Sequence, residues 1–231
     1  MEPVSYILQH GDTLYQLARR YQTTVQCVLA RNPGVDPRDL RVAQKIEILP
    51  GEKCTGAAQP TLFADMREAW EQHVYWDRMA MLSITERLKD QSDVVARTLK
   101  TADGIAKVFE PYYGPAAAES IAKLFTEHIQ IAGELITALR DGQADKAKAL
   151  QAQWYANADK IAETFAGIST NYPVEKTREM LYDHLHLLTQ MTALHLAGRY
   201  AEDIAAFDKV EQEGLAMADY FSNGIAGTVM G

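Results

Sequence analysis

Residues 6–34 read YILQHGDTLYQLARRYQTTVQCVLARNPG, and this stretch decides the fold of the N-terminal part of the chain. A short apolar run ends at Gly11, which allows a sharp turn. Asp12 or Thr13 is then placed to cap a helix whose apolar residues recur at helical spacing. The stretch therefore opens with a strand, a turn and a helix.

A second short helix and a second strand follow. Thr23 or Thr24 is placed to cap the helix, and Pro33 with Gly34 ends it, because proline cannot continue a helix and glycine tolerates a left-handed turn. Residues 45–50, KIEILP, alternate apolar and charged side chains as a half-exposed strand does. The predicted order is strand, helix, helix, strand (βααβ).

The same residues carry a family resemblance. Tyr-x-Leu-x-x-Gly-Asp-Thr-Leu at 6–14, Leu-Ala-x-x-Tyr at 17–21 and Asn-Pro at 32–33 resemble a LysM domain. The resemblance implies a βααβ fold that binds chains containing N-acetylglucosamine, as in peptidoglycan or chitin. It also implies a shallow groove between the loop after the first strand and the loop before the second.

Carried over by position, the implied glycan-binding residues fall in these two loops. They are Gly11, Asp12, Thr13, Leu14, Asn32, Pro33, Gly34, Leu40 and Val42. One departure concerns the second wall of the groove: the family usually has Pro-Gly before its last strand, and this chain has Val42-Ala43. The alternative interpretation is that Gly11, Asp12 and Asn32 only cap helices and form turns.

The composition indicates a second, larger domain and limits its partners. The chain has 231 residues, of which 47% are hydrophobic, so it can bury a core beyond one small module. The first 50 residues hold six basic and five acidic side chains, a net charge of +1, so the remainder carries −9 of the total −8. This acidic part has no basic cluster, which argues against nucleic acid and against anionic membrane surfaces.

Targeting signals are not visible in the sequence. No segment approaches the roughly 18 continuous apolar residues of a membrane span, and the chain starts without a basic region before an apolar stretch. We expect synthesis in the cytoplasm without a signal peptide. The protein would then meet its glycan from inside, as in the spore coat or cortex, or associate with the cell wall after loss of a leader from the sequence.

The chain is predicted to divide into three parts. They are a LysM-like module at 1–50, a Gly- and Pro-containing linker at 51–62 and a helical bundle at 63–226. Helical periodicity predicts six antiparallel, up-and-down helices, at 65–88, 92–109, 115–140, 143–168, 174–197 and 200–222. The fold class is thus α+β multidomain, with a small βααβ module followed by an all-α bundle.

The bundle sequence repeats. His73, His128 and His184 are 55 and 56 residues apart, and residues 101–106 are echoed 56 positions later by 157–162. A weaker third echo, Met-Ala-Asp at 217–219, comes 60 residues after the second and requires an inserted helical turn. We therefore expect three helical hairpins, each with a histidine on its first helix and an Ala-Asp pair on its second.

Each of these histidines lies on the apolar face of its helix, so all three are expected to be buried and to need polar partners. Candidate partners are Asp77, Asp103, Asp159 and Asp219. One hypothesis is a zinc, iron or copper centre, because imidazole and carboxylate suit these metals and helical bundles build such sites from facing helices. Its ligands would be His73, His128, His184, Asp77, Asp159 and Asp103.

Two other interpretations stay open. The histidines could be hydrogen-bonding groups of a small-molecule pocket, shaped by Arg78, Trp154 and Asn157. They could equally form a polar network that only fixes helix register in the core. The Glu-x-x-His spacing of diiron bundles is absent around all three histidines, which weakens the metal hypothesis.

The sequence favours a binding protein over an enzyme. It contains no phosphate-binding loop, no Gly-x-Ser-x-Gly motif and no paired-carboxylate motif for glycan hydrolysis. The helical half resembles uncharacterised bundle proteins of Gram-positive, often spore-forming, bacteria, which implies a bacterial source and partners in the spore coat. We expect a non-catalytic, peptidoglycan-binding protein of the spore or envelope; the alternative is a metal-binding bundle, enzyme or carrier, anchored by the LysM-like module.

Overall fold

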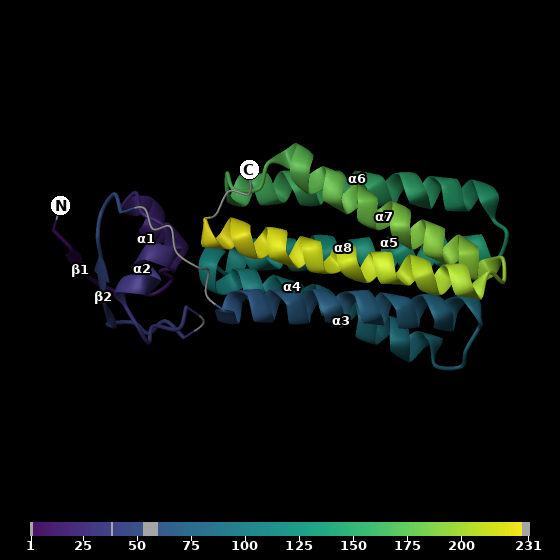
Figure 1. Ribbon diagram of the computed structural model, residues 1–231, viewed down its shortest axis with the longest axis horizontal. Coiled ribbons are helices and arrows are strands. Elements are labelled where there is room, and N and C mark those ends of the chain that lie inside the picture. Colours follow the sequence, from purple (N-terminus) through teal and green to yellow (C-terminus); the bar gives the residue numbers. More distant parts are fainter. Residues whose placement is uncertain (1, 38, 53–59, 228–231) are drawn as a thin grey trace.

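The computed structural model describes residues 2–37, 39–52 and 60–227, which form a small N-terminal module and a long helical bundle (Figure 1). The module consists of β1 (Val4–Ile7), α1 (Leu14–Arg20), α2 (Val25–Arg31) and β2 (Lys45–Ile48). The two strands pair antiparallel, with Val4 opposite Ile48 and Ile7 opposite Lys45. The predicted βααβ order is confirmed.

Side chains at the helix ends explain how so short a module is held together. Thr13 caps α1 in a reciprocal capping box with Gln16, and Thr24 caps α2. The Asn32 side chain ends α2, because its amide donates to Val28 O and Glu47 O while its oxygen accepts from Glu47 N. Asn32 therefore ties the second helix to the second strand.

The bundle has the six predicted helices. They are α3 (Pro60–Thr85), α4 (Gln91–Tyr113), α5 (Pro115–Arg140), α6 (Ala144–Ile168), α7 (Val174–Leu196) and α8 (Tyr200–Ala226). Several helix ends differ from the predicted ones, by up to five residues at the start of α3 and by four at the ends of α4 and α8. Helix α3 already starts inside the predicted linker 51–62, of which residues 53–59 lie outside the described residues, and α4 continues through Pro111 to end at Gly114.

The helices form a closed ring. Each helix packs against the next one along the chain, and α8 packs back against α3. Helix α5 also contacts both α3 and α7. The first helices of the three hairpins therefore face one another inside the bundle, which brings residues at equivalent positions of the repeats together.

A phenylalanine layer shows this convergence directly. Phe109, Phe165 and Phe221 are spaced by 56 residues and lie on the second helix of each hairpin. Their ring centroids are 5.1, 5.7 and 4.5 Å apart in the three pairings, and each side chain is at most 1% exposed. Because Phe221 keeps the 56-residue offset, the inserted turn predicted for the third repeat is wrong.

The turns within the hairpins also repeat. A residue in the left-handed conformation lies 14 positions after each repeated histidine: Arg87 at φ 53°, Gly142 at φ 68° and Gly198 at φ 71°. All three turns lie at the end of the bundle far from the N-terminal module (Figure 1). The histidines are therefore at the same height in the bundle, about 21 Å along the helix axis from their turns at the usual helical rise.

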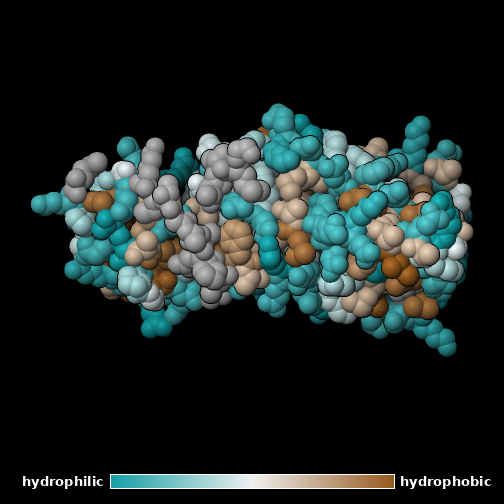
Figure 2. All heavy atoms as spheres, viewed as in Figure 1, coloured by the Kyte–Doolittle hydropathy of each residue, from teal (hydrophilic) through white to brown (hydrophobic). Residues whose placement is uncertain are grey.

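The N-terminal module sits on the opposite end of the bundle, as Figure 1 shows. The hydroxyl of Tyr15 on α1 donates to Ile168 O at the end of α6, 2.9 Å away. Its ring packs edge-on against Tyr113 at the end of α4, with centroids 4.6 Å apart. The visible surface of both parts is mainly hydrophilic with scattered hydrophobic patches (Figure 2).

Candidate functional site

The loops that the resemblance assigns to glycan binding contain both structural and exposed residues. Thr13 and Leu14 are buried, at 6% and 0% exposure, so the side chain of Leu14 belongs to the module core and cannot reach a glycan. Asp12 is half-buried and accepts hydrogen bonds from Tyr6 Oη and Gln9 N, which fixes the first loop.

The exposed residues of these loops define what a ligand could touch. Gly11, Pro33, Gly34 and Val42 are exposed and Leu40 is half-buried. Val42, at 62%, is among the most exposed large apolar side chains of the described residues. The module contacts the bundle through α1, which packs on α4, and through α2, which packs on α8, and these four residues remain exposed.

The backbone explains how Val42-Ala43 can stand where the family usually has Pro-Gly. Ala43 has φ 68°, the left-handed conformation that glycine adopts without strain and that costs other residues roughly 1 kcal/mol. Its N–H donates to Leu8 O, and Leu8 N donates to Gln44 O, so the turn is held against the first strand. The turn therefore keeps the left-handed backbone that glycine would supply, although alanine stands there.

The three repeated histidines are buried, as predicted, at 1%, 2% and 2% exposure. Each ring uses Nδ1 to bond a side chain on the second helix of its own hairpin. His73 bonds Thr101 Oγ1 at 3.0 Å, His128 bonds Asn157 Oδ1 at 2.8 Å, and His184 bonds Glu213 Oε2 at 2.7 Å. The three partners again stand 56 residues apart.

These partners fix which ring nitrogen carries the proton. The Thr101 hydroxyl donates to Thr98 O, so its oxygen accepts from His73 Nδ1–H. The Asn157 amide donates to Leu124 O, so its oxygen accepts from His128 Nδ1–H. Glu213 presents a carboxylate oxygen to His184 Nδ1. In each neutral ring, Nε2 is therefore the nitrogen with a free lone pair.

The Nε2 side of His73 meets a carboxylate from α3, and the ring of His184 lies beside that of His73. His73 Nε2 lies 3.2 Å from Asp77 Oδ2, and the rings of His73 and His184 are 6.0 Å apart between centroids. One ligand atom from each of His73, Asp77 and His184 lies within 4.8 Å of the others. Among the described residues this group alone has the composition and spacing of a metal site.

Comparison with known proteins decides the nature of the N-terminal part. Residues 6–48 match the LysM domain family.

The N-terminal module is a LysM domain.

No curated protein and no solved structure matches the chain. A LysM domain indicates binding to peptidoglycan or another N-acetylglucosamine glycan, and hence association with a cell wall. Within the described residues, no helix is both long enough and apolar enough to cross a membrane.

Burial and neighbouring charges set the protonation of the histidine layer in the bundle. Burial, together with the nearby rings of His184 and His128, holds the pKa of His73 well below its usual value. Burial lowers the pKa of His128 to about 3. It raises the pKa of Asp77 to about 7. Burial opposes charge on His184 as well, but the carboxylates of Glu213 and Asp77 outweigh it and raise the pKa of His184.

The aspartates predicted from the repeats do not join this layer. Asp103 is exposed, Asp159 binds Arg178 and Tyr182, and Asp219 binds Arg67. In each hairpin, one position of the second helix faces the histidine. Asp103 and Asp159 come two residues after that position, and Asp219 comes six residues after it, so all three point away from the core. Asp159 and Asp103 are therefore removed from the predicted ligand set, and His128 lies outside the group of three.

Two residues of the predicted small-molecule pocket, Trp154 and Asn157, both contact the ring of His128, whereas Arg78 is engaged elsewhere. The side-chain oxygen of Asn157 accepts a hydrogen bond from His128, and Arg78 pairs with Asp203. Trp154 also lines an apolar cavity of about 40 Å³ between the helices, and Asp77 lies on the wall of the same cavity. A pocket formed jointly by Arg78, Trp154 and Asn157 is not what the structure contains.

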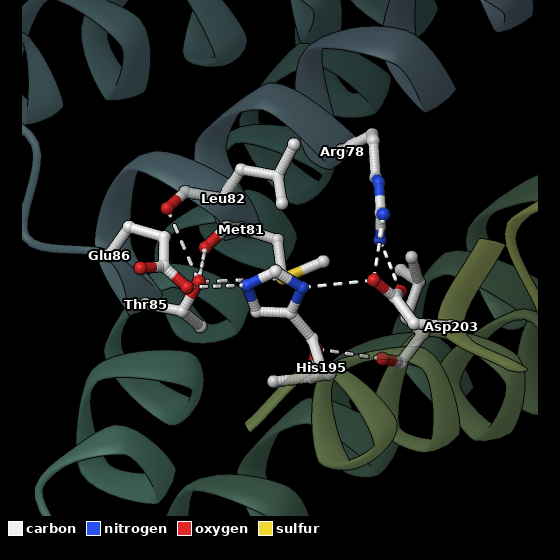
Figure 3. Close-up of polar contacts among 9 residues, drawn as sticks. Arg78, Met81, Leu82, Thr85, Glu86, His195 and Asp203 are labelled. Atoms are coloured by element: carbon white, nitrogen blue, oxygen red, sulfur yellow. Dashed lines mark hydrogen bonds and ion pairs between the residues drawn. The ribbon is translucent and has the colours of Figure 1, made fainter. Parts of the chain in front are cut away.

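A second histidine network, which the sequence did not reveal, lies close to the hairpin turns at Arg87 and Gly198. Figure 3 shows its polar contacts. His195 is 7% exposed and lies between two carboxylates, with Nδ1 2.9 Å from Asp203 Oδ2 and Nε2 2.9 Å from Glu86 Oε1. Arg78 donates from both terminal nitrogens to Asp203, whose side chain is 1% exposed. Despite burial, Arg78 and His195 hold the pKa of Asp203 below its usual value.

Two functional partners in the bundle could have been found from the sequence. Thr101 and Glu213 occupy the same repeat position as Asn157, and the 56-residue offset identifies both. Their chemistry hides this equivalence, because threonine, asparagine and glutamate do not resemble one another. They share only an oxygen that can accept the Nδ1 proton.

Proposed function

We propose that this protein binds peptidoglycan through its LysM domain and thereby holds the helical bundle at the bacterial envelope, in the cell wall or the spore. The observation that carries the proposal is the match of residues 6–48 to the LysM family. The role proposed for the domain is binding, because LysM domains hold glycans.

The exposed loops support a glycan contact at one edge of the domain. Pro33, Gly34 and Val42 present small or apolar surface to solvent beside exposed backbone. Apolar surface of this kind suits the faces of sugar rings and the methyl groups of N-acetyl substituents, whereas backbone N–H and C=O groups suit the amides. We assign contact with the glycan to Gly11, Pro33, Gly34, Leu40 and Val42.

The remaining loop residues shape the groove from behind. Thr13 caps α1, Asp12 closes the first loop, and Asn32 joins α2 to β2. Leu14 packs in the core. Substitutions at these positions would weaken glycan binding indirectly, by disturbing the fold of the domain. Substitutions at the exposed positions would weaken it directly, by removing contacts with the glycan.

A sedimentation assay with the full chain tests the proposal. Purified peptidoglycan from vegetative cells and from spores of a Gram-positive bacterium is incubated with the protein, and chitin serves as a second glycan. We expect the protein to co-sediment with peptidoglycan, and a preference for spore material would support the spore location. Absence of co-sedimentation with every glycan would rule out a working anchor.

Two matched variants make the assay specific. Val42→Asp places a charge in the proposed groove, and Ile204→Asp makes the same kind of change at a side chain that is 58% exposed on α8 of the bundle. We expect Val42→Asp to weaken retention about tenfold or more, since a buried, unpaired charge at a contact costs at least about 1.4 kcal/mol. Ile204→Asp should bind as the unmodified chain does. Equal retention of both variants would place the glycan elsewhere.

A further inference from the structure

We propose that His73, Asp77 and His184 bind a divalent transition-metal ion of the zinc class in the middle of the bundle. The proposal concerns the bundle alone and stands whether or not the LysM domain binds glycan. It narrows the wider ligand set expected from the sequence to three residues that the structure brings together.

The first argument is the composition and spacing of the group. The ligand atoms of the three residues all lie within 4.8 Å of one another, and the two histidines are almost completely buried. Ligands that surround a zinc ion tetrahedrally at about 2.1 Å are roughly 3.5 Å apart. Small inward movements of the side chains would therefore close the site around an ion.

The second argument is a contact between two acceptors. Thr101 takes the Nδ1 proton of His73, so Nε2 of this ring offers a lone pair, and it faces Asp77 Oδ2 at 3.2 Å. Two lone pairs at this distance repel unless a positive charge lies between them. That charge can be a proton or a metal ion.

The third argument separates these two possibilities. A proton shared by His73 and Asp77 would satisfy their contact but would leave His184 Nε2, which is buried and has no hydrogen-bond partner in the described part of the chain. A buried, unpaired nitrogen of this kind costs about 1–3 kcal/mol. An ion bound to all three residues satisfies both features at once.

The surroundings resemble the outer shell of a metal site. Histidines that bind metals almost always donate their other N–H to a carboxylate, carbonyl or similar acceptor, which fixes the ring orientation. Here Thr101 accepts from His73 and Glu213 accepts from His184, each from the second helix of the same hairpin. Thr101 and Glu213 are therefore positioning residues rather than ligands.

The ligand types select the class of ion. Two imidazole nitrogens and one carboxylate suit zinc, iron(II) or cobalt(II), whereas calcium and magnesium require mostly oxygen ligands. Three protein ligands leave a position for a further small ligand. Asp77 also lies on the wall of the 40 Å³ cavity, which is large enough to hold a water molecule beside the ion.

Metal titration of the full chain tests the site. The protein is stripped with a chelator and titrated with Co²⁺, whose visible absorption reports the ligands, and Zn²⁺ is then added as a competitor. We expect one equivalent of Co²⁺ to bind and to be displaced by Zn²⁺. X-ray absorption of the zinc-loaded, unmodified chain should show two imidazole ligands, and this measurement needs no variant. Failure to bind either ion, or binding without imidazole ligands, would overturn the proposal.

Variants locate the ion. Asp77→Asn and His184→Gln keep the approximate shape of each side chain but remove a direct ligand. Loss of an outer partner of a metal ligand already weakens binding by about 10- to 100-fold, so each of these variants should weaken Co²⁺ binding by at least about 100-fold. Glu213→Gln should weaken binding by about tenfold and alter the Co²⁺ spectrum through the orientation of His184. His186→Gln is the matched control: His186 lies on the same helix two residues away but is exposed, so its loss should change nothing.

Two outcomes with these variants would contradict the site. Undiminished binding in the Asp77→Asn/His184→Gln double variant would assign the ion to adventitious surface ligands. Loss of binding in His186→Gln would do the same. Circular dichroism of each variant checks that the helices are intact, and the X-ray absorption measurement remains decisive if one of them does not fold.

Discussion

The two buried histidine networks of the bundle differ in how completely they are paired. In the network at the far end, His195 has a carboxylate at each nitrogen, and Asp203 is bonded by both Arg78 and His195 (Figure 3). In the middle layer, His184 Nε2 and Glu213 Oε1 are buried and have no partner among the residues that the structure describes, and two acceptors face each other at His73 and Asp77.

This difference is the reason for proposing a metal site in the middle layer and a purely structural role for the far network. Arg78 and His195 both bond the buried Asp203 carboxylate, so the far network needs no further partner to stabilise the contact of α3 with α7 and α8. In the middle layer every Nδ1 is paired, whereas among the described residues His184 Nε2 has no partner. Buried polar groups are nearly always hydrogen-bonded, so the unpaired atoms of this layer require an explanation, and the proposed ion would supply one.

The largest expected effect breaks the far network. Asp203→Asn removes the charge that Arg78 and His195 share, and breaking a buried ion pair by changing one partner typically costs about 3–5 kcal/mol. We expect a loss of this size in the free energy of unfolding, measured by urea denaturation at neutral pH. Asp219→Asn is the control on the same helix, because its pair with Arg67 is 33–50% exposed and should contribute less than about 1 kcal/mol.

The next effect concerns pH and the middle layer. The pKa of His128 is lowered to about 3 in the folded protein, against about 6.5 when unfolded, so the unfolded chain takes up its proton first as pH falls. The stability that His128 contributes is thus full above pH 6.5 and decreases as pH falls toward 3. By pH 4.5, about two pH units below the unfolded pKa, we expect the unmodified chain to have lost about 3 kcal/mol relative to His128→Gln.

Urea titrations of both proteins at several pH values measure this difference. The raised pKa values of Asp77 and His184 act with the opposite sign, since these groups favour the folded state as pH falls, but they are present in both proteins. Asn157 can accept from the glutamine amide as it does from the ring, so the replacement preserves the hydrogen bond. Parallel pH profiles would show that His128 is not desolvated as the structure indicates.

A smaller effect tests how the middle layer is oriented. Thr101→Val keeps the shape of the side chain but removes the acceptor for His73 Nδ1–H, so we expect a loss of about 1–2 kcal/mol in unfolding free energy. Thr189→Val is the matched control, because the Thr189 hydroxyl bonds only Leu185 O of its own helix and should contribute about 0.5 kcal/mol or less. Equal losses would show that the histidine bond adds nothing.

The smallest effect compares the hairpin turns with a helical position. Gly198→Ala places a side chain at φ 71° and should cost about 1 kcal/mol. Gly104→Ala lies within α4 at an ordinary φ with open space around the new methyl group, so it should gain about 0.5–1 kcal/mol. Thermal denaturation of the two variants should therefore shift in opposite directions.

Much of the fold followed from the sequence because local signals and repeats were strong. Thr13, Thr24 and Asn32-Pro33 mark the ends of the LysM helices, and helical periodicity marks the six bundle helices. The burial of His73, His128 and His184 followed from the same periodicity. Helix α4 ran past Pro111 because a proline in the last turn removes one backbone hydrogen bond without preventing the following residues from remaining helical.

The histidine site was predicted less well, because the side chains that bond a histidine across a pair of helices depend on how the two helices are aligned. The repeated Ala-Asp pair suggested that Asp103 and Asp159 are partners of the histidines. A shift of two residues along a helix, however, turns a side chain by about 200°. The residues that do face the rings, Thr101, Asn157 and Glu213, share a position and not a residue type. The Arg78–Asp203–His195 network joins segments more than 100 residues apart and has no repeat to reveal it.

Because three equivalent hairpins form a closed ring, any one of them could come first along the chain without changing the neighbours of each helix. Each hairpin supplies its own ring and its own acceptor, the start of α3 and the end of α8 lie at the same end of the bundle, and Gly114 alone separates α4 from α5 at that end. A circular permutant that begins at α5 and joins α8 to α3 by a short linker would therefore rebuild the same interior. Such an architecture is what threefold duplication of a single ancestral hairpin would produce.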